Sequence, residues 1–398
     1  MRYERVICAL ALLVLSILIQ GCVEKFEYAA ETFEDAIVVE ATITDQVTTQ
    51  ELKISRTYAD VGDGPFPETS ANVTVTGDDG SSYAFAESQS GEYFSEQQFG
   101  AKPNVKYTLN IQTANGREYR SDAVEVTPEA QIDEVYAERK VDENGVAGVA
   151  IKVNGSGVNN DATYYQYRFE EAYKILSREN PIQDLIVISA VEPYEVDRVF
   201  KEREEYVCYN FDVSRDIIIE STSKFQQDVV QDFQVNFVPQ TDPKVAQRYS
   251  ILVKQFVLNR AGYEFYNTLK DISETESIFV QNQPGFLAGN IVSQTNPDEK
   301  VIGFFSVSSV SEKRIFFNFE DIFSLNDERG YFNSICDVTR PGLEELVRLL
   351  LDNRVKFLAE APPEAHPIEG GGPYRVMPSG CIDCTLHGTN VKPDFWEE

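Results

Sequence analysis

The sequence has very little histidine: 2 residues in 398, His366 and His387. Two histidines supply few ligands for a zinc or copper site and few bases for a histidine-based triad. No HExxH, GxSxG or P-loop spacing is present. We predict no catalytic, cofactor-binding or metal-binding residue, and hence no enzyme. Carboxylates are abundant, with 65 Asp plus Glu, so a surface hydrolase that cleaves glycans through paired carboxylates stays open as the alternative.

Basic residues are also scarce relative to acidic ones. The chain holds 35 Lys plus Arg, which leaves a formal net charge of −30. Such a charge repels a phosphate backbone, so we predict no nucleic-acid partner. It also repels anionic lipid head groups, so membrane attachment would have to come from acyl chains. We favour the interpretation that the charge keeps a tethered protein soluble; an acidic surface for cations or basic ligands remains the other interpretation.

Only one apolar run approaches membrane length, residues 6–19, and it is shorter than the roughly 20 residues of a spanning helix. Arg2 and Arg5 flank its start, and Ile19-Gln20-Gly21-Cys22 follows it. This order is typical of a lipoprotein signal peptide over residues 1–21, with a lipid on Cys22. An ordinary secretory signal or a transmembrane helix is the alternative. Residues 22–35 are rich in Glu and predict a solvated tether.

Cysteine is rare, with 6 residues, and two of these are accounted for by the leader (Cys8) and the lipid (Cys22). Four thiols in an oxidising compartment predict two disulfides. A metal site or a redox pair at the CxxC sequence is disfavoured, since no second CxxC completes a zinc ribbon. We favour the two pairings that would tie the last two cysteines to the first two. The four candidates are Cys208, Cys336, Cys381 and Cys384.

Aromatic residues are plentiful, with 25 Phe and 20 Tyr against 2 Met, which is typical of a β-rich core. The predicted fold class is mainly β with minor α. Residues 36–127 alternate in short runs, with hairpin signals at Asp79-Gly80 and Asn115-Gly116, and predict an immunoglobulin-like β-sandwich. The tyrosines of residues 164–169 could stack on sugars or peptides, but we favour core positions.

A larger β-rich domain with inserted helices is predicted over residues 128–360. Within it, residues 170–228 read as an insertion of short strands and helices, and residues 289–292 and 301–307 as strands. Apolar spacing predicts helices over residues 261–272 and 341–357. A cysteine-containing tail, residues 361–398, is predicted to be mainly irregular and packed on the body through disulfides.

Five stretches carry a family resemblance: residues 36–41, 260–266, 285–291, 301–305 and the tail 381–396. They resemble a family of Bacteroidota lipoproteins known as domain of unknown function 4249, over nearly the whole mature chain. The resemblance implies an outer-membrane lipoprotein, encoded beside TonB-dependent receptors, with no established catalytic residues. We therefore expect a non-enzymatic accessory binding protein that works with a TonB-dependent receptor in nutrient uptake. It would sit on the periplasmic or cell-surface face of the outer membrane and bind an unknown ligand.

Overall fold

The computed structural model describes residues 36–58, 64–159, 161–225, 227–274, 287–333, 335–362 and 371–398. Of these described residues, 49% lie in strands and 11% in helices, which confirms the mainly β fold class. The predicted signal peptide, Cys22, the tether and His366 lie outside the described residues. In the ranges just given, every helix is too short or too polar to cross a bilayer.

The first sheet is nearly closed and contains eleven strands. Its order is β19-β8-β7-β4-β5-β6-β2-β1-β20, with β3 beside β2 and β9 beside β7. Alternate residues of β1, among them Ile37 and Val39, are buried inside it, as the strand period of two requires. The strands are β1 (Ile37–Thr44), β2 (Glu51–Arg56), β3 (Phe66–Pro67), β4 (Asn72–Gly77), β5 (Ser82–Gln89), β6 (Glu92–Ser95), β7 (Lys106–Gln112), β8 (Glu118–Ser121), β9 (Val124–Glu125), β19 (Ile291–Ser293) and β20 (Val301–Ser308).

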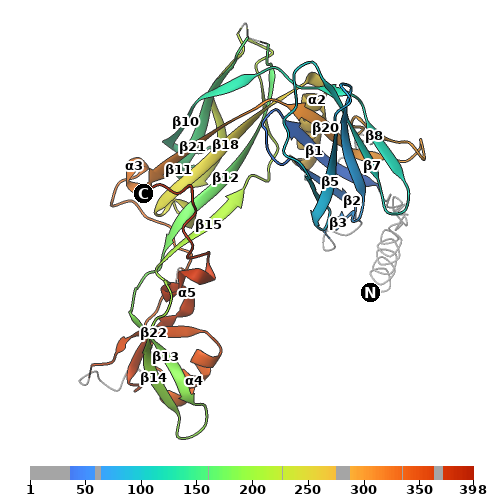
Figure 1. The fold of residues 1–398 in the computed structure, drawn as a ribbon. Coiled ribbons are helices and arrows are strands. Elements are labelled where there is room, and N and C mark those ends of the chain that lie inside the picture. Colours follow the sequence, from blue (N-terminus) through green and yellow to red (C-terminus); the bar gives the residue numbers. More distant parts are fainter. Residues whose placement is uncertain are drawn as a thin grey trace, which may run out of the picture.

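Two strands of this sheet come from far along the chain. β20 pairs in parallel with β1, from Ile37 opposite Val301 to Thr44 opposite Ser308 (Figure 1). The sequence places β19 and β20 in the larger domain, whereas the register places them in the first sheet. Nearly every residue of β20 is buried. Its apolar sequence therefore indicates a strand that is covered on both faces, but does not indicate which sheet the strand joins. The packing of this sheet as an immunoglobulin-like sandwich stays a prediction.

Two further sheets share one hydrophobic core. Val149, Ile151 and Val153 of one sheet pack in the same cluster as Tyr249 and Ile251 of the other. The helix expected over residues 261–272 is present as α2 (Arg260–Glu274). The three-stranded sheet contains β10 (Ala130–Val141), β11 (Ala147–Gly157) and β17 (Val229–Pro239); the five-stranded sheet contains β12 (Tyr164–Leu176), β15 (Val207–Val213), β16 (Ile218–Ser221), β18 (Arg248–Leu258) and β21 (Val310–Asn318). Short helices η1 (Pro243–Val245) and α3 (Phe319–Ile322) lie at their ends.

A separate small lobe stands away from these sheets (Figure 1). We call residues 177–205, 335–362 and 371–382 the distal lobe. Its core cluster consists of four buried residues, one on β13, one on α4 and one each on β22 and β23: Leu185, Leu346, Phe357 and Val376. Its elements are β13 (Gln183–Ser189), β14 (Glu195–Phe200), α4 (Leu343–Leu351), β22 (Val355–Glu360), β23 (Tyr374–Pro378) and α5 (Ser379–Ile382), with η3 (Cys384–Leu386) directly after it.

Three expectations for this lobe need correction. In the described part of residues 170–228, the chain forms strands and no helices. The helix expected over residues 341–357 ends at Leu351, because Asn353 adopts a φ of 53° and the chain continues as β22. The tail is more regular than expected, since β23 pairs with β22.

Candidate functional site

The four predicted cysteines form two disulfides, Cys208–Cys384 and Cys336–Cys381. This is one of the two pairings that the sequence favours. The CxxC cysteines are therefore each bonded to a distant partner rather than to each other. Across the described residues, no three His, Cys, Asp or Glu side chains gather in a way that could hold a metal ion.

His387 lies beside these disulfides and is packed by the protein. Its ring stacks on Phe332, with centroids 5.3 Å apart. Its Nε2 lies 2.9 Å from the Asn333 side-chain nitrogen and 3.2 Å from the Gly380 carbonyl oxygen. His387 therefore has a packing role at the base of the distal lobe.

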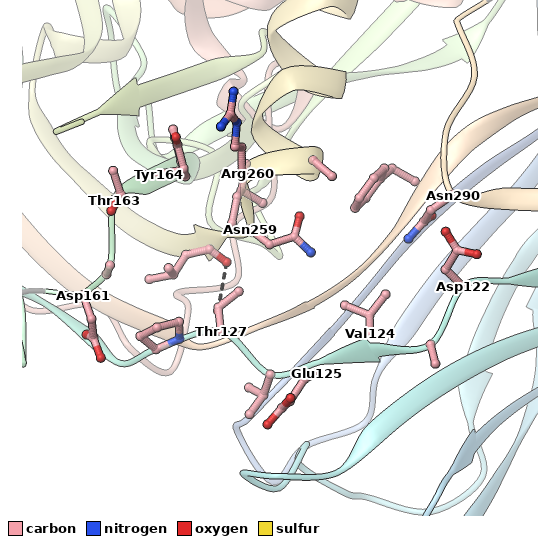
Figure 2. Close-up of a pocket in the computed structure, with 18 residues that line it drawn as sticks. Asp122, Val124, Glu125, Thr127, Asp161, Thr163, Tyr164, Asn259, Arg260 and Asn290 are labelled. Atoms are coloured by element: carbon pink, nitrogen blue, oxygen red, sulfur yellow. Dashed lines mark hydrogen bonds between the residues drawn. The ribbon is translucent and has the colours of Figure 1, made fainter. Parts of the chain in front are cut away.

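A cavity of about 520 Å³ opens where the first sheet meets the five-stranded sheet. We call it the junction cavity. Its volume lies within the roughly 300 to 1,000 Å³ that is usual for ligand sites. Figure 2 shows Asp122 and Asn290 on one side of it and Thr163 and Tyr164 on the other. Its walls come from the segment between β8 and β10, the start of β12, the end of β18 and the start of α2. Single residues before β19 and in β20 complete them.

The walls of the junction cavity are held by hydrogen bonds across the junction. The Thr127 hydroxyl donates to the Val257 carbonyl oxygen at 3.0 Å and accepts from the Ser309 amide at 2.9 Å. The Asn290 side chain accepts from the Phe305 amide at 2.8 Å and donates to the Phe305 carbonyl oxygen at 2.9 Å. Asn290 thus bonds to β20 as a neighbouring strand would, and the cavity wall is fixed before any ligand arrives.

Two glycines let the chain approach itself closely behind this wall. A Cβ at Gly289 would lie 1.6 Å from the Gly303 carbonyl oxygen. Gly303 has a φ of 149°, and a Cβ there would lie 2.2 Å from the Val39 carbonyl oxygen. No other residue fits these positions without moving the backbone. Residues 287–291 and 301–305, which carry part of the family resemblance, therefore meet at this corner. The third stretch, residues 260–266, reaches it through Phe265, whose ring lies 5.6 Å from that of Phe304.

The junction cavity offers mainly hydrogen-bond acceptors. Asp122, Glu125 and Asp161 are the acidic residues among those that line it. The single guanidinium, that of Arg260, donates to the Glu264 carboxylate at 2.7 Å, so its charge is already balanced. The Asn259 side-chain oxygen accepts from the Gly262 amide at 2.7 Å and caps the start of α2. A ligand with several donor groups would complement this lining best.

The aromatic stretch at the start of β12 divides between core and cavity. Tyr165 and Tyr167 are fully buried and donate to the side chains of Asp228 (2.6 Å) and Gln255 (2.9 Å). Burial raises the pKa of both phenols, and for Tyr165 the bond to Asp228 raises the pKa further. Tyr164 lines the junction cavity, with its ring 4.8 Å from that of Tyr263. The core position that the sequence favours is therefore confirmed for Tyr165 and Tyr167. Nothing in the neighbouring sequence indicates that Tyr164 lines a cavity instead.

A family described as "Domain of unknown function (DUF4249)" matches residues 23–314. The match covers the first sheet, most of the two sheets that share a core and every residue that lines the junction cavity. It is narrower than the resemblance expected from the sequence, since the tail motif at residues 381–396 lies beyond it. No curated protein matches the chain.

Proposed function

The chain belongs to the DUF4249 family, and from this premise we propose that it is a lipid-anchored, non-enzymatic binding protein of the bacterial outer membrane. It would act beside a TonB-dependent receptor in nutrient uptake. The observation that carries the binding role is the junction cavity, whose size suits a ligand and whose walls are held in place by Thr127 and Asn290.

The ligand proposed for this cavity is polar and rich in hydrogen-bond donors. Three carboxylates in the lining can each accept several hydrogen bonds. Oligosaccharides and short basic peptides both present such donors. The same acidic residues support the second candidate, a glycan hydrolase, because glycoside hydrolases cleave their substrates with two carboxyl groups roughly 5 to 10 Å apart. Release of new reducing ends from an oligosaccharide panel would favour the hydrolase over the binding protein.

Neutralising the cavity should weaken ligand binding. We expect the triple variant Asp122→Asn, Glu125→Gln and Asp161→Asn to lose about tenfold or more in affinity for the oligosaccharide or basic peptide that wild type binds best, because charge-assisted hydrogen bonds are lost. Isothermal titration calorimetry measures this. The matched control removes the same number of exposed charges elsewhere, at Glu143, Glu179 and Asp216. Equal affinity in both variants would place the ligand outside this cavity.

Lipidation at Cys22 can be tested separately from ligand binding. In a Cys22→Ser variant the acyl chains cannot attach, and an acidic chain has no basic patch to replace them, so we expect the protein in the soluble fraction after cell disruption. Cys8→Ser is the matched control: Cys8 would leave with the signal peptide, so this variant should stay with the membranes. Membrane retention of Cys22→Ser would contradict lipidation at that position. Immunoblotting of membrane and soluble fractions distinguishes these results.

The partner is tested by mild crosslinking of the lipidated protein in native outer membrane, followed by affinity capture and mass spectrometry. Capture of a TonB-dependent receptor supports the uptake role. If the protein is efficiently crosslinked and recovered but no receptor is captured in repeated experiments, the receptor is removed from the proposal. A freestanding binding protein or hydrolase then remains.

A further inference from the structure

The distal lobe exposes an unusual amount of apolar surface for a part of the chain with so small a core. On its β13–β14 hairpin, Ile182, Val191 and Phe200 are each about 70% exposed, and Ile186 and Ile188 are also exposed. Ile186 lies opposite Asp197 in the regular part of β13, and Ile188 lies at the irregularity between Val187 and Ser189. Apolar residues exposed in a group, rather than singly, mark surfaces that meet another molecule. Ile188 and Val191 lie at or near the turn, whereas Ile182 and Phe200 lie at the other end of the hairpin.

A groove of about 470 Å³ lies next to this hairpin, between its turn and helix α4. We call it the lobe groove. Ala190 and Tyr194 of the turn form one side, and Val347 and Leu351 of the helix form the other. Val347 is 2% exposed and belongs to the floor, whereas Leu351 is 59% exposed at the rim. The groove therefore combines apolar side chains at its floor and rim with charged ones, and it is open to a side chain from outside.

The charged rim of the lobe groove is acidic. Glu344, Glu345 and Asp352 line it, against a single cation, Arg348. The Arg348 guanidinium lies 3.9 Å from the Glu345 carboxylate, so one of the three negative charges is partly balanced. An apolar floor with an acidic rim is complementary to a segment that presents apolar side chains flanked by Lys or Arg.

The same charge argues against two other occupants. The whole chain carries a formal net charge of −30, so a second copy of it would bring like charges to an acidic rim. Anionic lipid head groups would be repelled in the same way. A partner protein with a locally basic segment would not be repelled by the acidic rim.

The base of the distal lobe is fixed, which suits a docking surface. Cys336–Cys381 closes a loop within the lobe, and Cys208–Cys384 ties its end to β15 of the five-stranded sheet. Because the lobe is cross-linked at its base, a partner that binds its tip meets a surface already oriented relative to the body, and less entropy is lost on binding.

We infer that the lobe groove is the docking site for a partner protein, which inserts the apolar side chains of a basic, amphipathic segment between α4 and the β13–β14 turn. The inference deepens the proposed function, on which it rests for the existence of a partner, by giving the surface that the partner meets. This surface is formed by residues other than those of the junction cavity, so ligand and partner can be bound together.

The first test uses a defined probe, a fluorescent peptide of alternating Lys and Leu, with a Glu and Leu peptide as the charge control. We expect the Lys and Leu peptide to bind full-length wild type and to lose about tenfold or more in affinity for Glu344→Gln, Glu345→Gln and Asp352→Asn combined. The neutralised surface variant at Glu143, Glu179 and Asp216 should bind as wild type does. Equal losses in both variants would show diffuse attraction to an acidic protein and overturn the inference.

A second variant, Leu351→Ser, tests the apolar part without changing charge. Its side chain is exposed, so the fold should be kept, and we expect a similar loss of peptide affinity with an unchanged circular dichroism spectrum. Full affinity in this variant would overturn the apolar insertion.

The native partner is then captured with a photo-crosslinking residue at position 351 and, as control, at position 325, where Leu325 is 76% exposed on the body. The inference expects a protein crosslink at 351 that the neutralised groove variant loses. A crosslink to a second copy of the chain would overturn the inference. Capture of a receptor that is equally efficient in the neutralised groove variant would also overturn it, but would leave the proposed function standing. Groove-dependent capture of a protein other than a receptor would support the inference and overturn the proposed function.

Discussion

Replacing Glu205 by glutamine is expected to lower the free energy of unfolding by about 3 to 5 kcal/mol, the usual cost of removing one partner from a buried ion pair. Glu205 is 5% exposed and lies at the base of the distal lobe. Its two carboxylate oxygens lie 2.6 and 2.7 Å from the Lys356 Nζ, and Lys201 and Arg203 are each 2.9 Å away. The glutamine leaves all three cations without their shared carboxylate. Lys356 keeps Asp184 and Arg203 keeps Asp383, so the uncompensated charge is mainly that of Lys201. Urea unfolding of the purified protein measures it.

The direction of the pH dependence follows from the same contacts. Burial raises the pKa of Glu205, but hydrogen bonds and ion pairs with Lys356, Lys201 and Arg203 outweigh burial and bring the pKa below its usual 4.5. Burial lowers the pKa of Lys356, and bonds to Glu205 and Asp184 reverse this and raise it above 10.5. The carboxylate therefore stabilises the folded chain above pH 4.5 and loses this effect as the pH falls through its lowered pKa. The lysine's contribution is present below pH 10.5 and is lost as the pH rises through its raised pKa.

The difference between wild type and Glu205→Gln should therefore be largest from about pH 5 to pH 10 and should shrink in acid. Glu202→Gln is the matched control, since Glu202 is exposed in the same loop and should change stability by less than about 0.5 kcal/mol. A loss of stability in Glu205→Gln that stays constant down to pH 3 would show that the side chain's shape, rather than its charge, is what the lobe base needs.

Removing the Cys208–Cys384 disulfide should destabilise the protein by about 5 kcal/mol, and removing Cys336–Cys381 by about 4 kcal/mol, from the loop entropy of the unfolded chain. The bonded residues are separated by 176 and 45 positions. Both cysteines of each pair are replaced by alanine, which leaves no free thiol and no buried hydroxyl group. Denaturant unfolding of the two double variants, beside wild type with and without reductant, measures each effect.

The two double variants serve as controls for each other because they act on different segments. Loss of Cys208–Cys384 releases the lobe from β15, so limited proteolysis should cut within residues 177–205 before the sheets are attacked. If either variant unfolds within about 1 kcal/mol of oxidised wild type, the corresponding disulfide is not what holds the lobe.

Local pattern was enough for several elements. Alternation in residues 36–44 predicts a strand with one buried face, and β1 buries Ile37 and Val39 as expected. Asp79-Gly80 and Asn115-Gly116 predict hairpins, and Gly80 and Gly116 have φ values of 87° and 84° between paired strands. Helical spacing over residues 261–272 predicts α2. Each of these signals is complete within a dozen residues, which is why a single sequence carries it.

Other elements depend on contacts that no local pattern contains. The apolar spacing of residues 341–357 continues past Leu351, so the end of α4 is set by the backbone at Asn353 and by the pairing of β22 with β23. The junction cavity forms because β20 pairs with β1 and Asn290 bonds to Phe305. The sequence singled out these stretches for their resemblance, but nothing in their spacing predicts that they meet.

The sequence by itself determined that the protein is mainly β, that it is strongly acidic, and that its four cysteines after Cys22 suit two disulfides. These properties depend on composition and on the order of neighbouring residues. Only the tertiary structure decided which of the two favoured cysteine pairings forms, which sheet receives β19 and β20, and where the junction cavity and the lobe groove lie. Strand register and side-chain packing across long stretches of chain set these features, and hydrophobic periodicity, which repeats every two or 3.6 residues, carries no information about a partner hundreds of residues away.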